Sequence, residues 1–245
     1  MIGPRIVIGT RAKDDGEKPF WISFADLMSA LMVLFLVVMS VALLAVTKTV
    51  TEAEEKDAVR SKEIAGLLRC VDDATQRHPG IKVVKERNAI DFGDRARFNS
   101  GSSQLAPEQA ITLRSFVPEV LRIARGECGK GWLKRILVEG FTDKTGDYLL
   151  NLNLSLQRSQ RVLCVLFSPP LAGEPPLVAD ELEQIRRLFL VGGYSSNSAK
   201  PSLDESRRIE LKLEFYTVNE RPVASAIGSG SSDEAITGSY GSCRI

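Results

Sequence analysis

Several residue types that commonly carry chemistry are scarce in this chain. It has one histidine, His78, and four cysteines, none of them at a CxxC or zinc-ligand spacing. No Cys/His pair, paired-carboxylate pattern or phosphate-binding loop is visible, and Gly192-Gly193 is typical of a turn at the end of a strand. We therefore expect a protein that is not an enzyme and that holds no metal or cofactor.

An excess of charge of one sign is also lacking. The formal net charge of the 245 residues is +1, so charge gives no argument for a nucleic-acid partner. We find no internal repeats. The length allows a membrane anchor plus one domain of ordinary size.

One apolar run dominates the N-terminal part of the chain. Residues 27–46 carry no charge, and at about 1.5 Å per residue they form a helix of roughly 30 Å, the thickness of a hydrocarbon core. We predict a transmembrane helix over residues 20–47.

Asp26 is the anomaly in this run. Its side chain is too short to reach the headgroups as a lysine would, and an isolated charge there costs several kcal/mol. It must be paired, protonated or in contact with water inside an assembly. The alternative, a carboxylate at the positive end of the helix dipole, fits the first turn better than this position. Small or β-branched residues share its helix face, which suits contact with other helices: Ser29, Ala30, Val33, Val37 and Ser40.

The flanks of the run predict its orientation. Residues 1–19 form a short tail with four basic residues, whereas the other flank has only Lys48 before several acids. The positive-inside rule places the tail in the cytoplasm. A cleaved signal peptide would have a shorter apolar region, so we interpret the run as an uncleaved anchor. Residues 48–79 read as a helical periplasmic linker that ends at Pro79-Gly80.

The four cysteines all follow the apolar run, and their even number suggests two disulfides in an oxidising compartment. Buried free thiols in a cytosolic domain are the alternative. We predict that Cys128 pairs with Cys164, because both lie near the C-terminal ends of helices that should run in the same direction. The pair Cys70–Cys243 then follows by elimination.

Residues 80–218 alternate between strand and helix patterns, which predicts an α/β fold, a two-layer sandwich. Residues 219–245 are rich in Gly and Ser and read as a flexible tail whose end Cys243 could pin. Pro118 implies a kink or an early end in its helix. We expect two strands within residues 81–92 and one strand each at 133–139, 185–191 and 209–218. We expect helices at 149–167 and 180–184, and a further helix that begins at residue 107.

The start of the apolar run resembles a known family. The stretch Trp21-Ile22-Ser23-Phe24-Ala25-Asp26-Leu27-Met28-Ser29 is similar to the opening of the B-subunit helix in ion-driven stators such as MotB. The resemblance implies that Asp26 carries a proton, and that a homodimer sits inside a pentameric MotA-like or ZorA-like membrane subunit. It also implies a single-pass protein of the bacterial inner membrane with a periplasmic C-terminal domain.

Three versions of this function stay open. The short tail, the motif and the four cysteines look most like the B subunit of the Zorya anti-phage defence system. A flagellar stator of the MotB type is the first alternative. A passive wall anchor, in which Asp26 carries no ion, is the second.

A second stretch resembles the OmpA-like peptidoglycan-binding domain. Residues 138–158 match the family's spacing from Gly140-Phe141-Thr142-Asp143 through Asn151 to Arg158, with Phe141 and Ser159 as departures. Residues 98–105 and 206–210 resemble two further family segments. The resemblance implies that peptidoglycan contacts Thr142, Asp143, Tyr148, Asn151, Leu154, Arg158 and Arg208.

The chemistry of this pattern suits one end of diaminopimelate, where an ammonium and a carboxylate occur together. Asp143 can accept hydrogen bonds from the ammonium, and Arg158 can bind the carboxylate through two of its N–H groups. We expect both side chains at the surface of the site, so that either could be truncated without unfolding a domain cut at residue 79. The alternative is a structural Asp143–Arg158 salt bridge.

Overall fold

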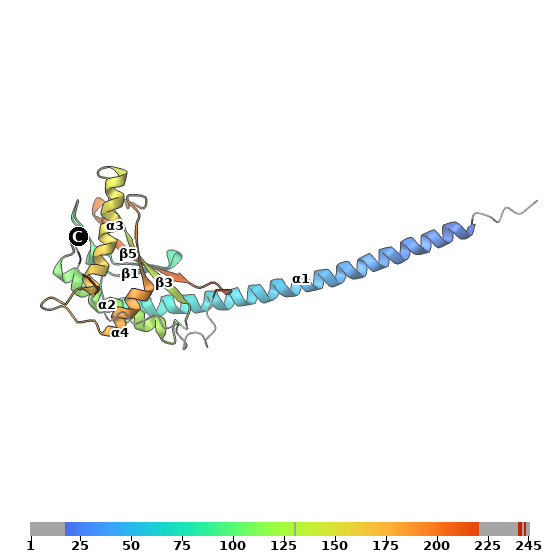
Figure 1. The fold of residues 1–245 in the computed structure, drawn as a ribbon, viewed down its shortest axis with the longest axis horizontal. Coiled ribbons are helices and arrows are strands. Elements are labelled where there is room, and N and C mark those ends of the chain that lie inside the picture. The colour runs from blue at the N-terminus through green and yellow to red at the C-terminus, as the bar shows by residue number, and fades with distance from the viewer. Residues whose placement is uncertain (1–17, 130, 221–239, 242, 244–245) are drawn as a thin grey trace, which may run out of the picture. The chain divides into compact units, whose positions relative to one another are not determined.

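The computed structural model describes residues 18–129, 131–220, 240, 241 and 243, with side chains from Trp21 onward. The chain divides into two compact units, Met1–Glu55 and Lys56–Ile245, and helix α1 (Lys18–Thr75) contributes to both of them (Figure 1). Most of the predicted tail, residues 219–245, lies outside the described residues.

The first unit is the N-terminal part of α1. In the described part of the chain, α1 is the one helix long and apolar enough to cross a membrane, and its side chains from Trp21 to Val50 are exposed. Ser29 and Ser40 each donate a hydrogen bond to a carbonyl four residues earlier, 2.8 and 2.7 Å away. Their hydroxyls are therefore satisfied within the helix, as an apolar surrounding requires.

The C-terminal part of α1 belongs to the second unit. Leu67 and Val71 are 1% and 0% exposed and lie in the hydrophobic core. Arg60 adds a hydrogen bond of 2.7 Å from its Nε to the carbonyl of Tyr216, more than a hundred residues further along the chain. The linker predicted at residues 48–79 is helical, but the prediction did not include this packing.

The second unit is an open five-stranded sheet with helices packed on it. The strand order is β1-β2-β5-β3-β4, and all neighbours are antiparallel except the pair β3–β4. The predicted α/β fold class is confirmed. The strands are β1 (Lys82–Val84), β2 (Ala89–Asp91), β3 (Leu133–Gly140), β4 (Phe189–Gly193) and β5 (Ile209–Phe215). The helices after α1 are α2 (Pro107–Arg125), α3 (Tyr148–Phe167), α4 (Ala179–Leu188) and α5 (Leu203–Ser206), with short 3₁₀ turns η1 (Lys85–Arg87) and η2 (Gly93–Ala96).

The core lies between the sheet and the helices. Along β5, Ile209, Leu211 and Leu213 are buried in it, and alternation along the strand sends Glu210 to the other face. The helices contribute further buried side chains, among them Val71, Phe116, Leu121, Val162, Leu166 and Ile185.

Two predicted elements differ from the structure. Ile185 was assigned to a strand, but α4 continues to Leu188 and β4 begins only at Phe189. Of the two outcomes predicted at Pro118, a kink or an early end, the early end does not occur, because α2 continues through Pro118 to Arg125. Short apolar runs fit a buried helix and a buried strand equally well. Ile185 is buried in the core as part of α4.

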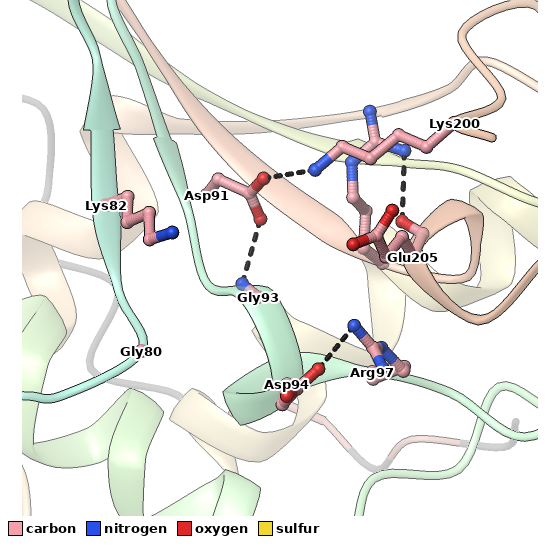
Figure 2. Close-up of a pocket in the computed structure, with 9 residues that line it drawn as sticks. Gly80, Lys82, Asp91, Gly93, Asp94, Arg97, Lys200 and Glu205 are labelled. Carbon is pink, nitrogen blue, oxygen red and sulfur yellow. Dashed lines mark hydrogen bonds and ion pairs between the residues drawn. The ribbon is translucent and has the colours of Figure 1, made fainter. Parts of the chain in front are cut away.

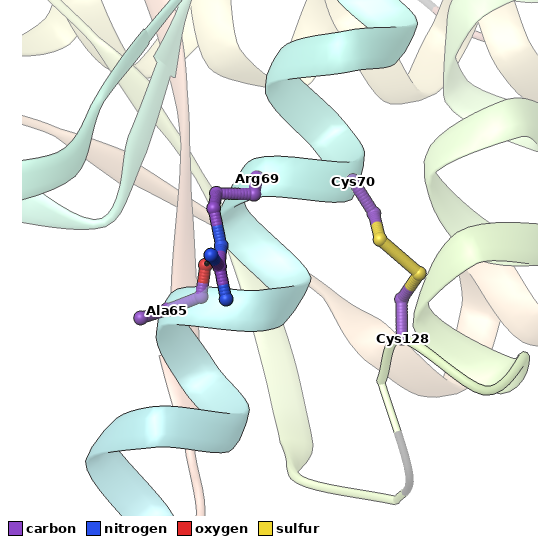
Figure 3. Close-up of a disulfide and its surroundings, with 4 residues drawn as sticks. All are labelled: Ala65, Arg69, Cys70 and Cys128. Atoms are coloured by element: carbon purple, nitrogen blue, oxygen red, sulfur yellow. Dashed lines mark hydrogen bonds between the residues drawn. A yellow bond between two sulfur atoms is a disulfide. The ribbon is translucent and has the colours of Figure 1, made fainter.

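The predicted disulfide pairing is wrong, although all four cysteines are bonded. Cys70 pairs with Cys128, with 6.4 Å between their Cα atoms (Figure 3), and Cys164 pairs with Cys243 at 5.7 Å. Because the end of α1 packs into the core, Cys70 lies beside the turn after α2 that carries Cys128. Cys164 therefore pairs with Cys243 near the end of the chain. Nearby, the rings of Tyr240 and Phe167 stack with their centroids 4.6 Å apart.

Candidate functional site

The candidate site of the second unit is the loop that joins β3 to α3. Gly140 ends β3 so close to α3 that a Cβ atom built on it would lie 1.9 Å from the carbonyl oxygen of Ser155. The backbone N–H of Thr142 then donates to the carbonyl of Ser195, at 3.0 Å. These two contacts fix the start of the loop against a helix and a neighbouring segment.

Asp143 is buried in this loop, contrary to the expectation that it lies at the surface of the site, and two donors hold it there. Its carboxylate accepts hydrogen bonds from the backbone N–H of Thr145 at 2.9 Å and from the Arg207 guanidinium at 3.0 Å. Burial would raise the pKa of Asp143, but the Thr145 N–H and Arg207 outweigh it and hold that pKa below its ordinary value. Asp143 is therefore charged at neutral pH, with Arg207 as its ion-pair partner.

Arg158 is buried, which corrects the expectation that it lies at the surface of the site. It is 0% exposed and donates to three backbone carbonyls, those of Ser102, Phe141 and Asn99, at 2.9, 2.7 and 3.1 Å. Burial lowers the pKa of Arg158 to about 10, so its charge is kept at pH 7. Arg158 thus ties the start of the β3–α3 loop to the segment before α2.

The Asp143–Arg158 salt bridge, the alternative to ligand binding, is not the pairing that the described residues make. Asp143 uses Arg207, and Arg158 uses backbone carbonyls. A guanidinium has five N–H groups, and a carboxylate can accept about four hydrogen bonds. Both groups therefore keep some hydrogen-bonding capacity beyond the contacts that hold them.

The other predicted ligand residues differ in exposure. Asn151 is buried and donates from Nδ2 to the carbonyl of Thr145 at 2.9 Å, so it shapes the loop. Tyr148 is 53% exposed at the start of α3, and Leu154 is half-buried on the same helix. Thr142 is buried, and its hydroxyl has no hydrogen-bond partner in the described part of the chain.

Arg208 and Arg207 have different environments. The Nε of Arg208 donates to Glu210 at 2.7 Å, and its guanidinium lies 4.3 Å from the centre of the Phe141 ring. Arg208 is therefore a buried, paired residue, and Arg207 is the arginine that contacts Asp143. Side chains alternate along β5, and continuing this alternation back from Glu210 places Arg208 on the same side and Arg207 on the opposite side, toward the loop. This alternation is the sequence signal that could have distinguished the two arginines.

Asp26 is the candidate site of the first unit. It lies on the exposed, apolar part of α1, and no hydrogen bond or ion pair connects it to any other described residue. Because α1 is helical throughout this part, the small and β-branched residues predicted beside Asp26 do share its face. A lone carboxylate on an apolar helix needs a partner that this chain segment does not supply.

Comparisons show which known proteins the chain is similar to. The family model described as "Membrane MotB of proton-channel complex MotA/MotB" matches residues 9–54, which include Asp26. The Zorya protein ZorB of Escherichia coli O139:H28 (strain E24377A / ETEC) is 42% identical over 222 residues, 90% of each chain.

Two solved structures are more distant. The cell wall anchor of the T6SS from Pseudomonas aeruginosa is 19% identical, with a TM-score of 0.39, and the match covers 60% of this chain and 95% of that one. The periplasmic domain of Helicobacter pylori MotB is 16% identical, with a TM-score of 0.38, and the match covers 53% and 74% of the two chains.

Proposed function

Since the chain belongs to the family of the Zorya protein ZorB, we propose that it is the wall-anchored B subunit of a proton-driven membrane motor. In this proposal it is a single-pass protein of the bacterial inner membrane, with residues 1–19 in the cytoplasm and the second unit in the periplasm. Its role is conduction and anchoring, without an enzymatic activity or a cofactor. Family membership, combined with an unpartnered Asp26, is the observation that carries the proposal.

The proton-carrying step follows from the environment of Asp26. A homodimer places its two α1 helices inside a pentameric membrane subunit, MotA-like or ZorA-like, which supplies the partner groups or water that Asp26 lacks. Asp26 binds a proton from one side and releases it to the other. Moving one charge through 100 mV is worth about 2.3 kcal/mol, so a few protons can drive a conformational step.

The test of this step is Asp26→Asn in the complete complex. Asparagine keeps the size of the side chain but cannot exchange a proton, so we expect normal insertion and assembly with proton flux and phage protection abolished. Ser29→Ala, one turn further along the same face, is the control and should retain both. Full protection by the Asp26→Asn variant would contradict the proton-carrying role and favour the passive anchor.

Wall binding is the second part of the proposal. The β3–α3 loop has a charged carboxylate at Asp143, a charged guanidinium at Arg158 and an exposed aromatic at Tyr148. The hydrogen-bonding capacity that Asp143 and Arg158 retain suits the ammonium and carboxylate of a diaminopimelate side chain. Two of the residues predicted to contact peptidoglycan, Asn151 and Arg208, act here by holding the loop and the neighbouring β5.

Sacculi binding by the purified full-length chain tests this part. Asp143→Asn removes the charge and Tyr148→Ala removes an exposed ring, and each should weaken binding by about 1–3 kcal/mol. The control is Leu171→Ala, which truncates another exposed side chain (68%) in the loop after α3. Thermal melts accompany each variant, and unchanged binding by both site variants with intact melting would contradict the assignment.

We propose that the complex acts in anti-phage defence, as the resemblance to the Zorya B subunit implies, in preference to a flagellar stator. The distinguishing experiment is a pair of assays in one host, with the chain supplied together with its membrane partner. Protection from phage without rescue of swimming in a strain that lacks its flagellar stator supports the defence role. Rescue of swimming would support the flagellar alternative.

A further inference from the structure

A small polar cavity lies on the side of the domain formed by β1, β2, η2 and the segment before β5 (Figure 2). Its volume is about 250 Å³, which is below the range usual for drug-sized ligands. Of the residues predicted to bind peptidoglycan, it is lined only by Arg208. It is therefore a separate feature from the β3–α3 loop.

The floor of the cavity depends on two glycines. Gly93 has a positive φ of 52°, and a Cβ atom built on it would lie 2.7 Å from the carbonyl oxygen of Gly80. A larger residue at Gly93 would therefore be strained and would push the two segments apart. The glycines allow the backbone after β2 to lie directly against the turn before β1.

Most charges around the cavity are already paired. Asp91 accepts from the Gly93 N–H at 2.8 Å with one oxygen and from Lys200 at 2.6 Å with the other. Asp94 pairs with Arg97 across one turn. Both oxygens of Asp91 are thus engaged, although its cross-strand neighbour in the β1–β2 register is another cation, Lys82.

Two charges of opposite sign remain without partners. Within the described residues, the side chains of Lys82 and Glu205 make no hydrogen bond or ion pair, and both are exposed. Figure 2 shows them pointing toward the cavity from opposite walls. The Nε of Arg97, on a third wall, is buried and has no hydrogen-bond partner in the described part of the chain.

We propose that this cavity binds a small zwitterion of the amino-acid type, with its carboxylate at Lys82 and its ammonium at Glu205. A simple anion would leave Glu205 unpaired and facing it, and a simple cation would do the same to Lys82. A ligand with both groups satisfies both walls. The size of the cavity fits one amino-acid unit.

Such a zwitterion has two sources, a free amino acid or the side-chain end of diaminopimelate in a peptidoglycan stem peptide. The inference does not depend on wall binding at Asp143. Calorimetry should therefore use the full-length chain in detergent with the Asp143→Asn substitution, which weakens any binding at the β3–α3 loop. The probes are meso-diaminopimelate, a diaminopimelate-containing muropeptide, and two half-ligands, pimelate without ammonium groups and cadaverine without carboxylates.

We expect meso-diaminopimelate to bind and neither half-ligand to bind measurably. Lys82→Gln or Glu205→Gln should each weaken binding about tenfold or more, because each removes one charge-assisted contact. Lys62→Gln and Glu86→Gln are the matched controls, since they remove an exposed cation and an exposed anion away from the cavity, and they should bind as the Asp143→Asn protein does.

Each other outcome has a defined meaning. Absent binding of meso-diaminopimelate, equal binding of pimelate, or equal losses in the two controls would overturn the inference. If the site holds, tighter binding of the muropeptide identifies the wall as the source, and tighter binding of the free amino acid identifies a soluble ligand.

Discussion

Arg158 shows that a residue can satisfy a binding motif and still serve the fold. Its three hydrogen bonds go to backbone carbonyls, and its guanidinium lies 5.0 Å from the centre of the Phe98 ring. Spacing in the sequence places Arg158 correctly on α3. It cannot tell whether the guanidinium reaches a ligand or the carbonyls of two loops, because that depends on how the segment before α2 folds.

The first prediction concerns the cost of removing this side chain. Arg158→Ala leaves three carbonyls without donors in a buried place, so we expect a loss of about 3 kcal/mol or more in the free energy of unfolding. Asp143→Asn is the comparison, because its amide oxygen can still accept from Thr145, and what is lost is the charge and the contact with Arg207. Urea titrations of the two variants measure the difference, and equal stability would contradict the structural role of Arg158.

The second prediction concerns acid. The pKa of Asp143 is lower in the folded chain than the value of about 3.9 expected when unfolded, so its contribution to stability is present above that pH. This contribution disappears as the pH falls from about 4 through the folded pKa. The unsubstituted chain should thus have a larger free energy of unfolding than Asp143→Asn at pH 7, and the difference between the two should narrow below pH 4. If unfolding titrations show a constant difference in the free energy of unfolding across this pH range, the result would argue against the Arg207 ion pair.

At the scale of elements, the contact between the end of β3 and α3 positions the candidate site. Gly140 and Gly193 both lie against the backbone or hydroxyl of Ser155, at distances that a Cβ atom could not occupy without movement. The C-terminal ends of the parallel strands β3 and β4 therefore both contact α3 at Ser155. Any separation there would move the loop that carries Asp143.

A pair of identical substitutions tests this contact. Gly140→Ala should destabilise the domain by about 3 kcal/mol, because the methyl group collides with a backbone carbonyl that cannot give way easily. Gly66→Ala should stabilise it by up to about 1 kcal/mol, because Gly66 lies inside α1 and nothing lies within 4 Å of its Cβ position. Thermal melts of the two variants should shift in opposite directions, and a shift of the same sign would refute the argument.

The elements show where sequence reasoning succeeds and where it ends. The strand at 133–139 and the helix at 149–167 were predicted almost to their ends, because each has a clear period and a flanking turn. The α4–β4 boundary was missed because Ile185 and Phe189 are both buried in a run that fits either state. The prediction of a helical linker at residues 48–79 did not include the core contacts of α1, because the surface that these residues cover is formed by distant segments.

At the scale of the whole molecule, the folding unit begins inside α1. Leu67, Leu68 and Val71 are buried in the core, and burying one such side chain contributes about 1.5–3 kcal/mol. A chain cut at residue 79 loses all of them, together with Ile64 and the disulfide partner Cys70. The loss is comparable with the net stability of about 5–15 kcal/mol that is typical of a domain.

We therefore predict that a fragment of residues 56–245 folds and that a fragment of residues 80–245 does not. Circular dichroism and a cooperative thermal transition distinguish the two, with both fragments expressed under oxidising conditions. Cys128 is left without a partner in the shorter fragment, so the comparison is repeated with Cys128→Ser to exclude aggregation through a free thiol. A cooperative transition in the 80–245 fragment would contradict the assignment of α1 to the core.

The disulfides were the part of the molecule least accessible from the sequence. Their number and compartment follow from composition, but their pairing depends on which turns of α1 pack in the domain. Once Cys70 is placed in the core, its partner in the turn after α2 is fixed by proximity, and Cys164 is left for Cys243.

The Cys70–Cys128 bond also determines how the domain bears tension. A pull along α1 toward the N-terminus would peel its last turns from the core one side chain at a time, if packing alone resisted. The covalent link at Cys70 stops this peeling five residues before α1 ends and passes the load to the turn after α2. In an optical trap, the oxidised domain should hold until the sheet itself ruptures, and the reduced domain should release α1 first, at lower force.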